Sequence, residues 1–296
     1  MKKAFLQLHL AVFFAGFTGI LGRLITLNEG LLVWYRLMIS AATMWILFLA
    51  MKRIQRIPFS EILKIMAVGF LAAMHWVTFY GSIKSANVSV GLVCFSSVGF
   101  FTALLEPMVF KKRIDVVELL LGILVMIGIY VIFQFDPRYQ IGIAIGIISA
   151  ILGSLFPIYN KLLLRNVNVE TLLTYELTGG FLALTALLPA YLHYFPTKQL
   201  LPDWSNLLWL LVLSWICSVW AFQLSTNALK KLSAFTVNLT YNLEPVYGIL
   251  LAFAIYHEYE NLSHWFYIGF VLIALALIIH IVMLKRKEKK ALLSEG

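Results

Sequence analysis

Apolar runs of about 20 residues recur along almost the whole chain, and this pattern limits the fold more than any other feature. Coiled as an α-helix with a rise of about 1.5 Å per residue, such a run crosses the roughly 30 Å hydrocarbon core of a bilayer. Lipid offers no hydrogen-bond partner to the backbone, so only helices and closed barrels cross it. Barrel strands alternate apolar and polar residues over about 10 positions, whereas these runs are continuous. The sequence therefore predicts an all-α integral membrane protein.

Composition agrees with a membrane location. Hydrophobic residues make up 61% of the chain and charged residues 12%, against about 45–50% and about 25% in soluble domains. The first apolar run follows Met1-Lys2-Lys3 without a small-residue cleavage site, so we interpret it as a span and not as a signal peptide. Cys94 and Cys217 lie in apolar runs without metal-ligand spacing, and we expect neither a metal site nor a cofactor.

Ten membrane-spanning helices are expected, joined mostly by short connections. The longest connection, 194–205, is too short for a domain, which excludes a soluble catalytic or nucleic-acid-binding module. The expected spans are 4–27, 31–51, 62–83, 87–110, 116–134, 141–163, 171–193, 206–228, 233–256 and 263–284.

Lysine and arginine gather on one side of this topology. An even number of spans puts both termini on one side, and cytoplasmic loops are the ones enriched in basic residues. Cytoplasmic termini place 18 of the 23 basic residues inside and four outside, and leave Arg36 within the second span. The net charge of +9 then reflects inner loops and a basic tail at 285–296, with no nucleic-acid partner. We expect a multi-pass protein of the cytoplasmic (inner) membrane with both termini in the cytoplasm.

The two halves of the chain resemble each other. Aligning Tyr35 with Tyr175 places Arg36 on Glu176, and a similar shift places SIKSANVS on ALKKLSAF. Residues 1–134 and 141–284 therefore read as two copies of a five-helix unit. Because five is odd, the second copy enters the membrane upside down, as in many secondary transporters. The predicted fold is ten transmembrane helices as two inverted five-helix repeats around a central cavity.

Three features carry a family resemblance: the two five-helix halves, an arginine early in helix two, and the runs HW…FYGSIKSANVS and ALKKLSAFTVNLTYNLEP. In these features the chain resembles the EamA-type members of the drug/metabolite transporter superfamily. The resemblance implies small organic metabolites such as amino acids as substrates, usually exported. It also implies a central cavity formed mainly by helices one, three, four, six, eight and nine.

The chain departs from the family pattern in its first half. Members often have a proline midway along helix four, equivalent to Pro245 in helix nine, but this region reads CFSSVGFF here. The glutamate typical after each half is present as Glu258 in the second half, while Lys111-Lys112 stands in the first. Strict symmetry around helix four is therefore not expected.

Glu244 is the leading candidate for a functional group. It lies near the middle of an expected span, where an ionised side chain costs about 2.5–3.5 kcal/mol on insertion scales. Pro245 follows and frees carbonyl groups, and a broken midplane helix is how transporters build coordination sites. Asn238, Tyr241 and Asn242 share one face of this helix. We expect this face to line the cavity; bonding between helices is the alternative.

Other polar residues within the expected spans extend the candidate cavity. His75, followed by Trp76 and by Tyr80 one turn later, suits proton exchange or an aromatic-lined cavity. A histidine that is simply bonded to a neighbour is the alternative. We therefore take His75 and Glu244 as candidate proton-coupling residues. The remaining candidates for the cavity are Ser96, Ser97, Gln223 and Asn227.

Three charges within the spans are interpreted as structural. Arg36 lies about 9 Å from the outer end of its span, and we expect its guanidinium to reach the outer interface or to bond to a neighbouring helix end. Glu176 lies at the equivalent position near the inner face, so a direct pair between the two is not expected. Glu106 lies near Lys111 and Lys112, which favours a local charge pair.

The leading function is a secondary transporter that works by alternating access of the two halves around a midplane cavity. The chain lacks a P-loop, so a gradient supplies any driving force and no ATPase subunit is required. An uncoupled facilitator remains open, as does a channel, although the charged rings that select ions are lacking. An intramembrane lipid-modifying enzyme is a further alternative, but Asp115, Asp136 and Asp203 are isolated from one another. Substrate, direction and oligomeric state are not specified by the sequence.

Overall fold

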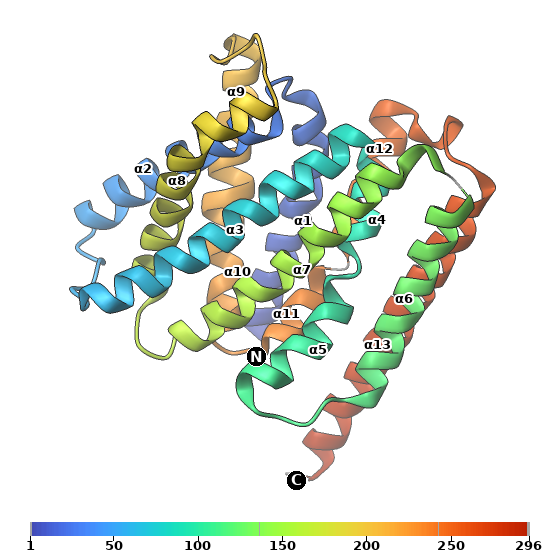
Figure 1. Cartoon of the computed structure of the whole chain (residues 1–296). Helices are drawn as coiled ribbons and strands as arrows, with labels where there is room; N and C mark the ends of the chain where they lie inside the picture. Colours follow the sequence, from blue (N-terminus) through green and yellow to red (C-terminus); the bar gives the residue numbers. More distant parts are fainter. Residues whose placement is uncertain (1, 136, 242, 295–296) are drawn as a thin grey trace.

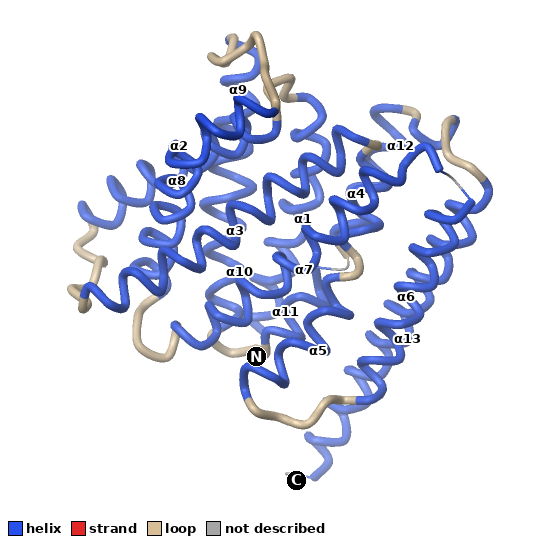
Figure 2. The backbone as a smooth tube through the Cα atoms, in the orientation of Figure 1, coloured by secondary structure: helices blue, strands red, loops and turns tan. Residues whose placement is uncertain are grey.

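The structure of the protein is a computed structural model. It consists of helices joined by loops, and the part of the chain that it describes contains no strand (Figure 2). The structure describes residues 2–135, 137–241 and 243–294. Within these ranges it leaves out the side chains of 133–135, 137, 234, 235, 238, 239, 277, 280, 281 and 284–294, so the side chains of the predicted basic tail lie outside the described part.

The helices follow one another in chain order with short connections. The first half of the chain forms α1 (Lys2–Leu24), α2 (Glu29–Ala50), α3 (Phe59–Ser85), α4 (Val88–Phe95), α5 (Val98–Phe110) and α6 (Val116–Phe135). The second half forms the 3₁₀ turn η1 (Pro137–Tyr139), α7 (Gln140–Leu163), α8 (Val169–Tyr194), α9 (Trp204–Ser214), the π-helix η2 (Trp215–Trp220), α10 (Ala221–Leu229), α11 (Ala234–Tyr241), α12 (Glu244–Tyr256), the 3₁₀ turn η3 (Glu258–Glu260) and α13 (His264–Ser294).

Four helices begin at an asparagine or aspartate that caps the backbone. Asn28, Asn87, Asn168 and Asp203 each accept a hydrogen bond from the N–H three residues later, at 2.8 to 2.9 Å. A side-chain oxygen at this position satisfies one of the N–H groups that a helix start leaves without a partner. These residues therefore fix where α2, α4, α8 and α9 begin.

Seven helices in the described ranges are long and apolar enough to cross a membrane. Two of them are composite, because Val88–Phe110 joins α4 to α5 and Trp204–Leu229 joins α9, η2 and α10. Three further apolar stretches are shorter: Val116–Ile132, Glu244–Tyr256 and His264–Ala276. The chain is thus an all-helical membrane protein with multiple spans.

The two halves of the chain are interleaved. Helix α3 of the first half packs along α7 and α8 of the second half. Conversely, α10 and α9 of the second half pack against α1 and α2 of the first. Helices α4 and α5 contact α7, while α12 contacts α1. Helix α6 pairs lengthwise with α13 at one side of the bundle, and α1 begins toward the same end at which α13 finishes (Figure 1).

Helices α3 and α8 approach so closely that a side chain is excluded between them. A Cβ at Gly69 would lie 1.9 Å from the carbonyl oxygen of Glu176 and 2.9 Å from the nitrogen of Gly180. Only glycine fits at such a distance, and small residues commonly permit close packing between membrane helices. This contact fixes Glu176 in the interior, where it is 1% exposed.

Three of the expected spans are interrupted. Helix α4 gives way to α5 at Ser96 and Ser97, and the π-helix η2 separates α9 from α10. Helix α11 ends at Tyr241, and α12 begins at Glu244 with Pro245 in its first turn, where a missing N–H is tolerated. The break expected at Pro245 is therefore present, and the first half has its own break at two serines.

Candidate substrate cavity

A cavity lies between the two halves of the chain. Its lining comes from α1, α2, α3 and α4 of the first half and from α7, η2, α10, α11 and α12 of the second. The helices that the family resemblance implied are all represented, with α2 in addition. Arg36 and Glu244 contribute charge to a wall that is otherwise largely aromatic: Trp76, Phe79, Phe95, Phe156, Phe222 and Tyr241. A mostly apolar wall with a few polar groups is typical of small-molecule sites.

Arg36 is held inside the protein by three neighbours. Its Nε donates to the hydroxyl of Ser218 at 2.6 Å, and its Nη1 donates to the hydroxyl of Tyr80 at 2.8 Å. The guanidinium lies over the ring of Trp76, 4.1 Å from the centroid. Planar stacking combined with directed hydrogen bonds is specific to arginine. The side chain is therefore fixed at the cavity wall.

The structure corrects one expectation about Arg36. Its guanidinium does not extend to the outer interface, since the residue is 2% exposed and its partners belong to α3 and η2. The second interpretation, a bond to a neighbouring helix, describes the observed geometry, but Arg36 also lines the cavity. The π-helix accounts for this: in its wider turn, Ser218 bonds to Leu213, five residues back, while facing Arg36.

Glu244 lies at the first residue of α12 and faces the same cavity. It is 5% exposed and interacts electrostatically with Arg36. The start of a helix carries partial positive charge from its aligned peptide dipoles, which favours a carboxylate there. The break before α12 thus places an acidic group at a helix start inside the membrane protein, facing the cavity.

His75 is enclosed by aromatic rings. Its ring lies 5.3 Å from that of Phe95, 5.7 Å from Phe156 and 6.0 Å from Phe79, measured between centroids. Nδ1 lies 2.9 Å from the carbonyl oxygen of Ser149, to which it donates, so Nε2 is the nitrogen left for another proton. His75 lines the cavity, but the three aromatic rings that its imidazole contacts are apolar.

The other candidate residues are placed differently. Trp76 and Tyr241 line the cavity, whereas Tyr80 is fully buried behind Arg36. The backbone of Asn238 belongs to α11, but its side chain, like the whole of Asn242, lies outside the described residues.

Four polar candidates do not appear in the cavity wall. The hydroxyls of Ser96 and Ser97 bond to carbonyl groups one turn back in α4, at 3.3 and 2.7 Å. Gln223 and Asn227 lie on a neighbouring face of α10, and Ser225 and Thr226 line the cavity in their place. The π-helix that precedes α10 changes the phase of this helix, and periodicity in the sequence does not reveal such a change.

Asn160 also lines the cavity, although it is not among the candidate residues predicted from the sequence. It lies in the last turn of α7 and is 1% exposed. Its Nδ2 donates to both carboxylate oxygens of Glu176, at 3.1 and 2.9 Å. Glu176 therefore bonds to Asn160, whereas Arg36 bonds to Ser218 and Tyr80. Glu106 is 7% exposed and interacts electrostatically with Lys161.

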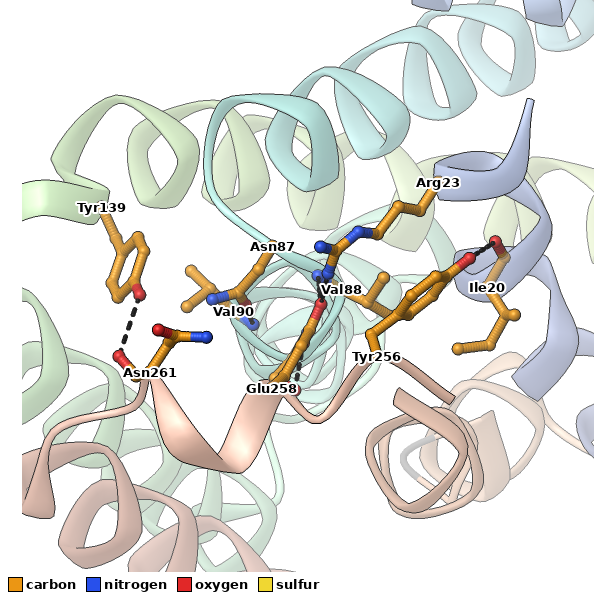
Figure 3. Close-up of polar contacts among 10 residues, drawn as sticks. Ile20, Arg23, Asn87, Val88, Val90, Tyr139, Tyr256, Glu258 and Asn261 are labelled. Carbon is orange, nitrogen blue, oxygen red and sulfur yellow. Dashed lines mark hydrogen bonds and ion pairs between the residues drawn. The ribbon is translucent and has the colours of Figure 1, made fainter. Parts of the chain in front are cut away.

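Another buried carboxylate, that of Glu258, joins three helix ends (Figure 3). Glu258 accepts hydrogen bonds from the N–H groups of Val88 and Ser89 at 3.1 and 2.9 Å, and it pairs with Arg23 of α1. The guanidinium of Arg23 also lies 4.3 Å from the ring centroid of Tyr256. We call these five residues the Glu258 cluster; it ties the end of α1 and the end of α12 to the start of α4.

Comparison with known families decides what kind of protein contains this cavity. A model of the EamA-like transporter family matches residues 2–134 and again 140–280. The chain belongs to the EamA-like transporter family. As an EamA-like transporter it is a membrane protein of the drug/metabolite transporter superfamily, with two family repeats, and it carries small molecules.

One solved structure shows the same fold. A protein crystal structure matches this EamA-like transporter with a TM-score of 0.68 at 18% sequence identity, over 97% of this chain and 99% of that chain. At this identity the likeness concerns the fold alone. No match to the chain was found among the curated proteins.

Proposed function

We propose that this EamA-like transporter exports small zwitterionic metabolites such as amino acids across the cytoplasmic membrane. The observation that carries the proposal is that Arg36 and Glu244 line the same aromatic-walled cavity. A guanidinium binds carboxylates with charge-assisted hydrogen bonds, and a carboxylate does the same for an ammonium group. A molecule with both groups matches the cavity better than a purely anionic or cationic one.

The proposed architecture is ten spans arranged as two inverted repeats, at 1–134 and 141–284. The reciprocal packing of α3 on α7 and α8, and of α9 and α10 on α2 and α1, supports it, because a two-fold relation exchanges these contacts. The position of the start of α1 and the end of α13 at one end of the bundle supports termini on one side (Figure 1). The excess of basic residues favours the cytoplasm for that side.

Alternating access requires the cavity to open to each side in turn. We place the Glu258 cluster at the outer side, since it follows helix nine of the proposed topology. There it holds α1, α4 and α12 together, and opening toward the outside separates these helix ends. The two repeats then rock around the cavity, as in other transporters with inverted repeats.

We assign the proton-coupling role to Glu244 in preference to His75. Glu244 faces a positive partner, Arg36, so its loss of charge on protonation changes an interaction within the cavity. His75 is surrounded by phenylalanine rings and uses Nδ1 for a structural hydrogen bond. A proton on His75 would also be repelled by Arg36, with which it interacts.

The test is untargeted metabolomics of cells and medium, with wild-type protein, with Arg36→Gln at matched protein level, and without expression. The proposal expects one or a few amino acids or related zwitterions to rise in the medium only with the wild type. Purified protein in proteoliposomes then measures transport of the enriched compounds. Accumulation of these compounds inside the cells would show import instead of export. Enrichment of anions alone would contradict the proposed zwitterionic substrate class.

A further inference from the structure

We propose that Asn160 is a substrate-binding residue that accepts a hydrogen bond from a donor group of the cargo, best an ammonium group, and that Glu176 positions its amide. The inference rests on the proposed function, because it concerns recognition in the same cavity. It adds a second recognition point to the Arg36 and Glu244 pair and assigns a role to the buried carboxylate of the second repeat.

The amide of Asn160 is only half satisfied. Both of its hydrogen bonds in the structure run from Nδ2 to Glu176, at 3.1 and 2.9 Å. Its Oδ1 is buried and has no hydrogen-bond partner among the described residues. Buried polar atoms are nearly always bonded, and leaving an acceptor without a donor costs free energy. Because Asn160 lines the cavity, a cargo N–H or O–H group is in a position to complete the pair.

Glu176 determines which end of the amide serves the cargo. Both oxygens of the Glu176 carboxyl accept from Nδ2, so the NH₂ end of Asn160 faces Glu176 and Oδ1 points elsewhere. The backbone of Glu176 lies so close to Gly69 of α3 that no side chain fits between them, which fixes α8 at this point. Glu176 is therefore a positioning residue that acts through Asn160.

The hydrogen bonds from Asn160 to Glu176 also favour a particular donor. Donation from Nδ2 to the Glu176 carboxyl polarises the amide and makes Oδ1 a stronger acceptor, which favours an ammonium group over a neutral hydroxyl. The cavity then has Arg36, from α2 of the first repeat, and Oδ1 of Asn160, whose amide is bonded to Glu176 from α8 of the second repeat. Arg36 and Glu176 occupy the same position when the sequences of the two repeats are aligned. The arrangement orients a dipolar cargo with its carboxylate toward Arg36 and its amine toward Asn160.

The experiment measures binding to purified full-length protein. The probes are the L-amino acids, each compared with the carboxylic acid that lacks the α-amino group, such as phenylalanine and 3-phenylpropionate. Asn160→Leu removes the acceptor at similar size. Glu176→Gln retains Asn160 but introduces an amide that can donate to Oδ1 and turn it away from the cavity. Ser154→Ala, also buried in α7 but outside the cavity lining, is the matched control.

The expected result is a selective loss. Asn160→Leu and Glu176→Gln weaken binding of the best amino acid by about tenfold or more, while its deaminated analogue binds as before. The double variant is no weaker than Asn160→Leu alone, because Glu176 acts through Asn160. Equal losses for both members of a probe pair, or no loss, overturn the inference while the proposed function stands. Binding of no probe to the wild type overturns the proposed function and the inference with it.

Discussion

The carboxylate of Glu258 accepts two hydrogen bonds from Ser89, from its backbone N–H at 2.9 Å and from its hydroxyl at 2.7 Å. With Arg23 bound to the same carboxylate, this contact joins segments that are far apart in the sequence (Figure 3). The group also satisfies the first N–H groups of α4, which would otherwise lack partners. One side chain therefore links the end of α1, the start of α4 and the turn that follows α12.

Replacing Glu258 should loosen that closure. Glu258→Ala leaves the start of α4 and Arg23 without their acceptor, and we expect the free energy of unfolding to fall by about 1–3 kcal/mol. Cys217, which lines the cavity, should also react faster with a membrane-impermeant maleimide added outside, in a Cys94→Ala background. Thermal unfolding in detergent and the labelling rate in intact cells measure the two effects.

Glu260→Ala is the control for this prediction, because Glu260 is exposed in the same 3₁₀ turn. It should change neither the unfolding temperature nor the labelling rate of Cys217. If Glu258→Ala destabilises the protein but leaves labelling unchanged, the cluster is structural and does not close the outer side.

Lysine should not substitute for Arg36. Arg36→Lys retains the charge but loses the fork that bonds to Ser218 and Tyr80 and the stacking on Trp76. We expect a loss of about 1–3 kcal/mol in unfolding free energy and transport reduced by at least about tenfold. Arg56→Lys, at an exposed loop position, is the control. Wild-type transport by Arg36→Lys would show that point charge alone is sufficient.

Glutamine at position 244 should separate proton coupling from cargo binding. Glu244→Gln retains shape and hydrogen bonding but cannot exchange a proton. We expect normal insertion, loss of transport driven by a pH gradient, and persistent exchange of cargo between the two sides of proteoliposomes. If the exchange of cargo is weakened as well, Glu244 binds the cargo directly. Wild-type rates with and without the gradient would remove Glu244 from the mechanism and leave His75 as the proton candidate.

The contact of α3 with α8 should tolerate no added methyl group. Gly69→Ala places a Cβ 1.9 Å from a backbone oxygen of α8, whereas a Cβ at Gly81, in the same helix, meets its nearest atom at 3.5 Å. Backbone atoms cannot move aside as a flexible side chain does, so we expect Gly69→Ala to lower the yield of folded protein severely and Gly81→Ala to be nearly neutral. Size-exclusion chromatography in detergent compares them. Equal yields would contradict the close packing.

The orientation of the chain predicts a labelling pattern. A single cysteine at Lys198, in the exposed α8–α9 connection, should react with an impermeant reagent in intact cells. One at Arg113, exposed between α5 and α6, should react only after the cells are opened. Both positions are accessible in the structure, so protection from the reagent reports the side of the membrane. Reaction at 113 and protection at 198 would reverse the proposed topology.

Local sequence was sufficient for the elements themselves. Apolar runs located the helices because hydropathy is a sum over neighbouring residues. The break at Pro245 followed from the missing N–H of proline. The placement of Glu244 and His75 inside spans required only counting, and both line the cavity of the folded protein.

Tertiary structure decided which side chains meet. Arg36 finds Ser218 182 positions away, and Glu258 finds Ser89 169 positions away. Gln223 and Asn227, in the helix that follows the π-helix, are not part of the cavity wall, whereas Asn160 lines it with one end of its amide bonded to Glu176. The apolar helices and the break at Pro245 follow from residues close in sequence, so the sequence by itself determined them, whereas the break at Ser96 and Ser97 and the π-helix were found only in the structure. The cavity forms where helices of the two halves pack together. Which charged groups line it, and that Oδ1 of Asn160 lacks a hydrogen-bond partner among the described residues, therefore depends on tertiary structure.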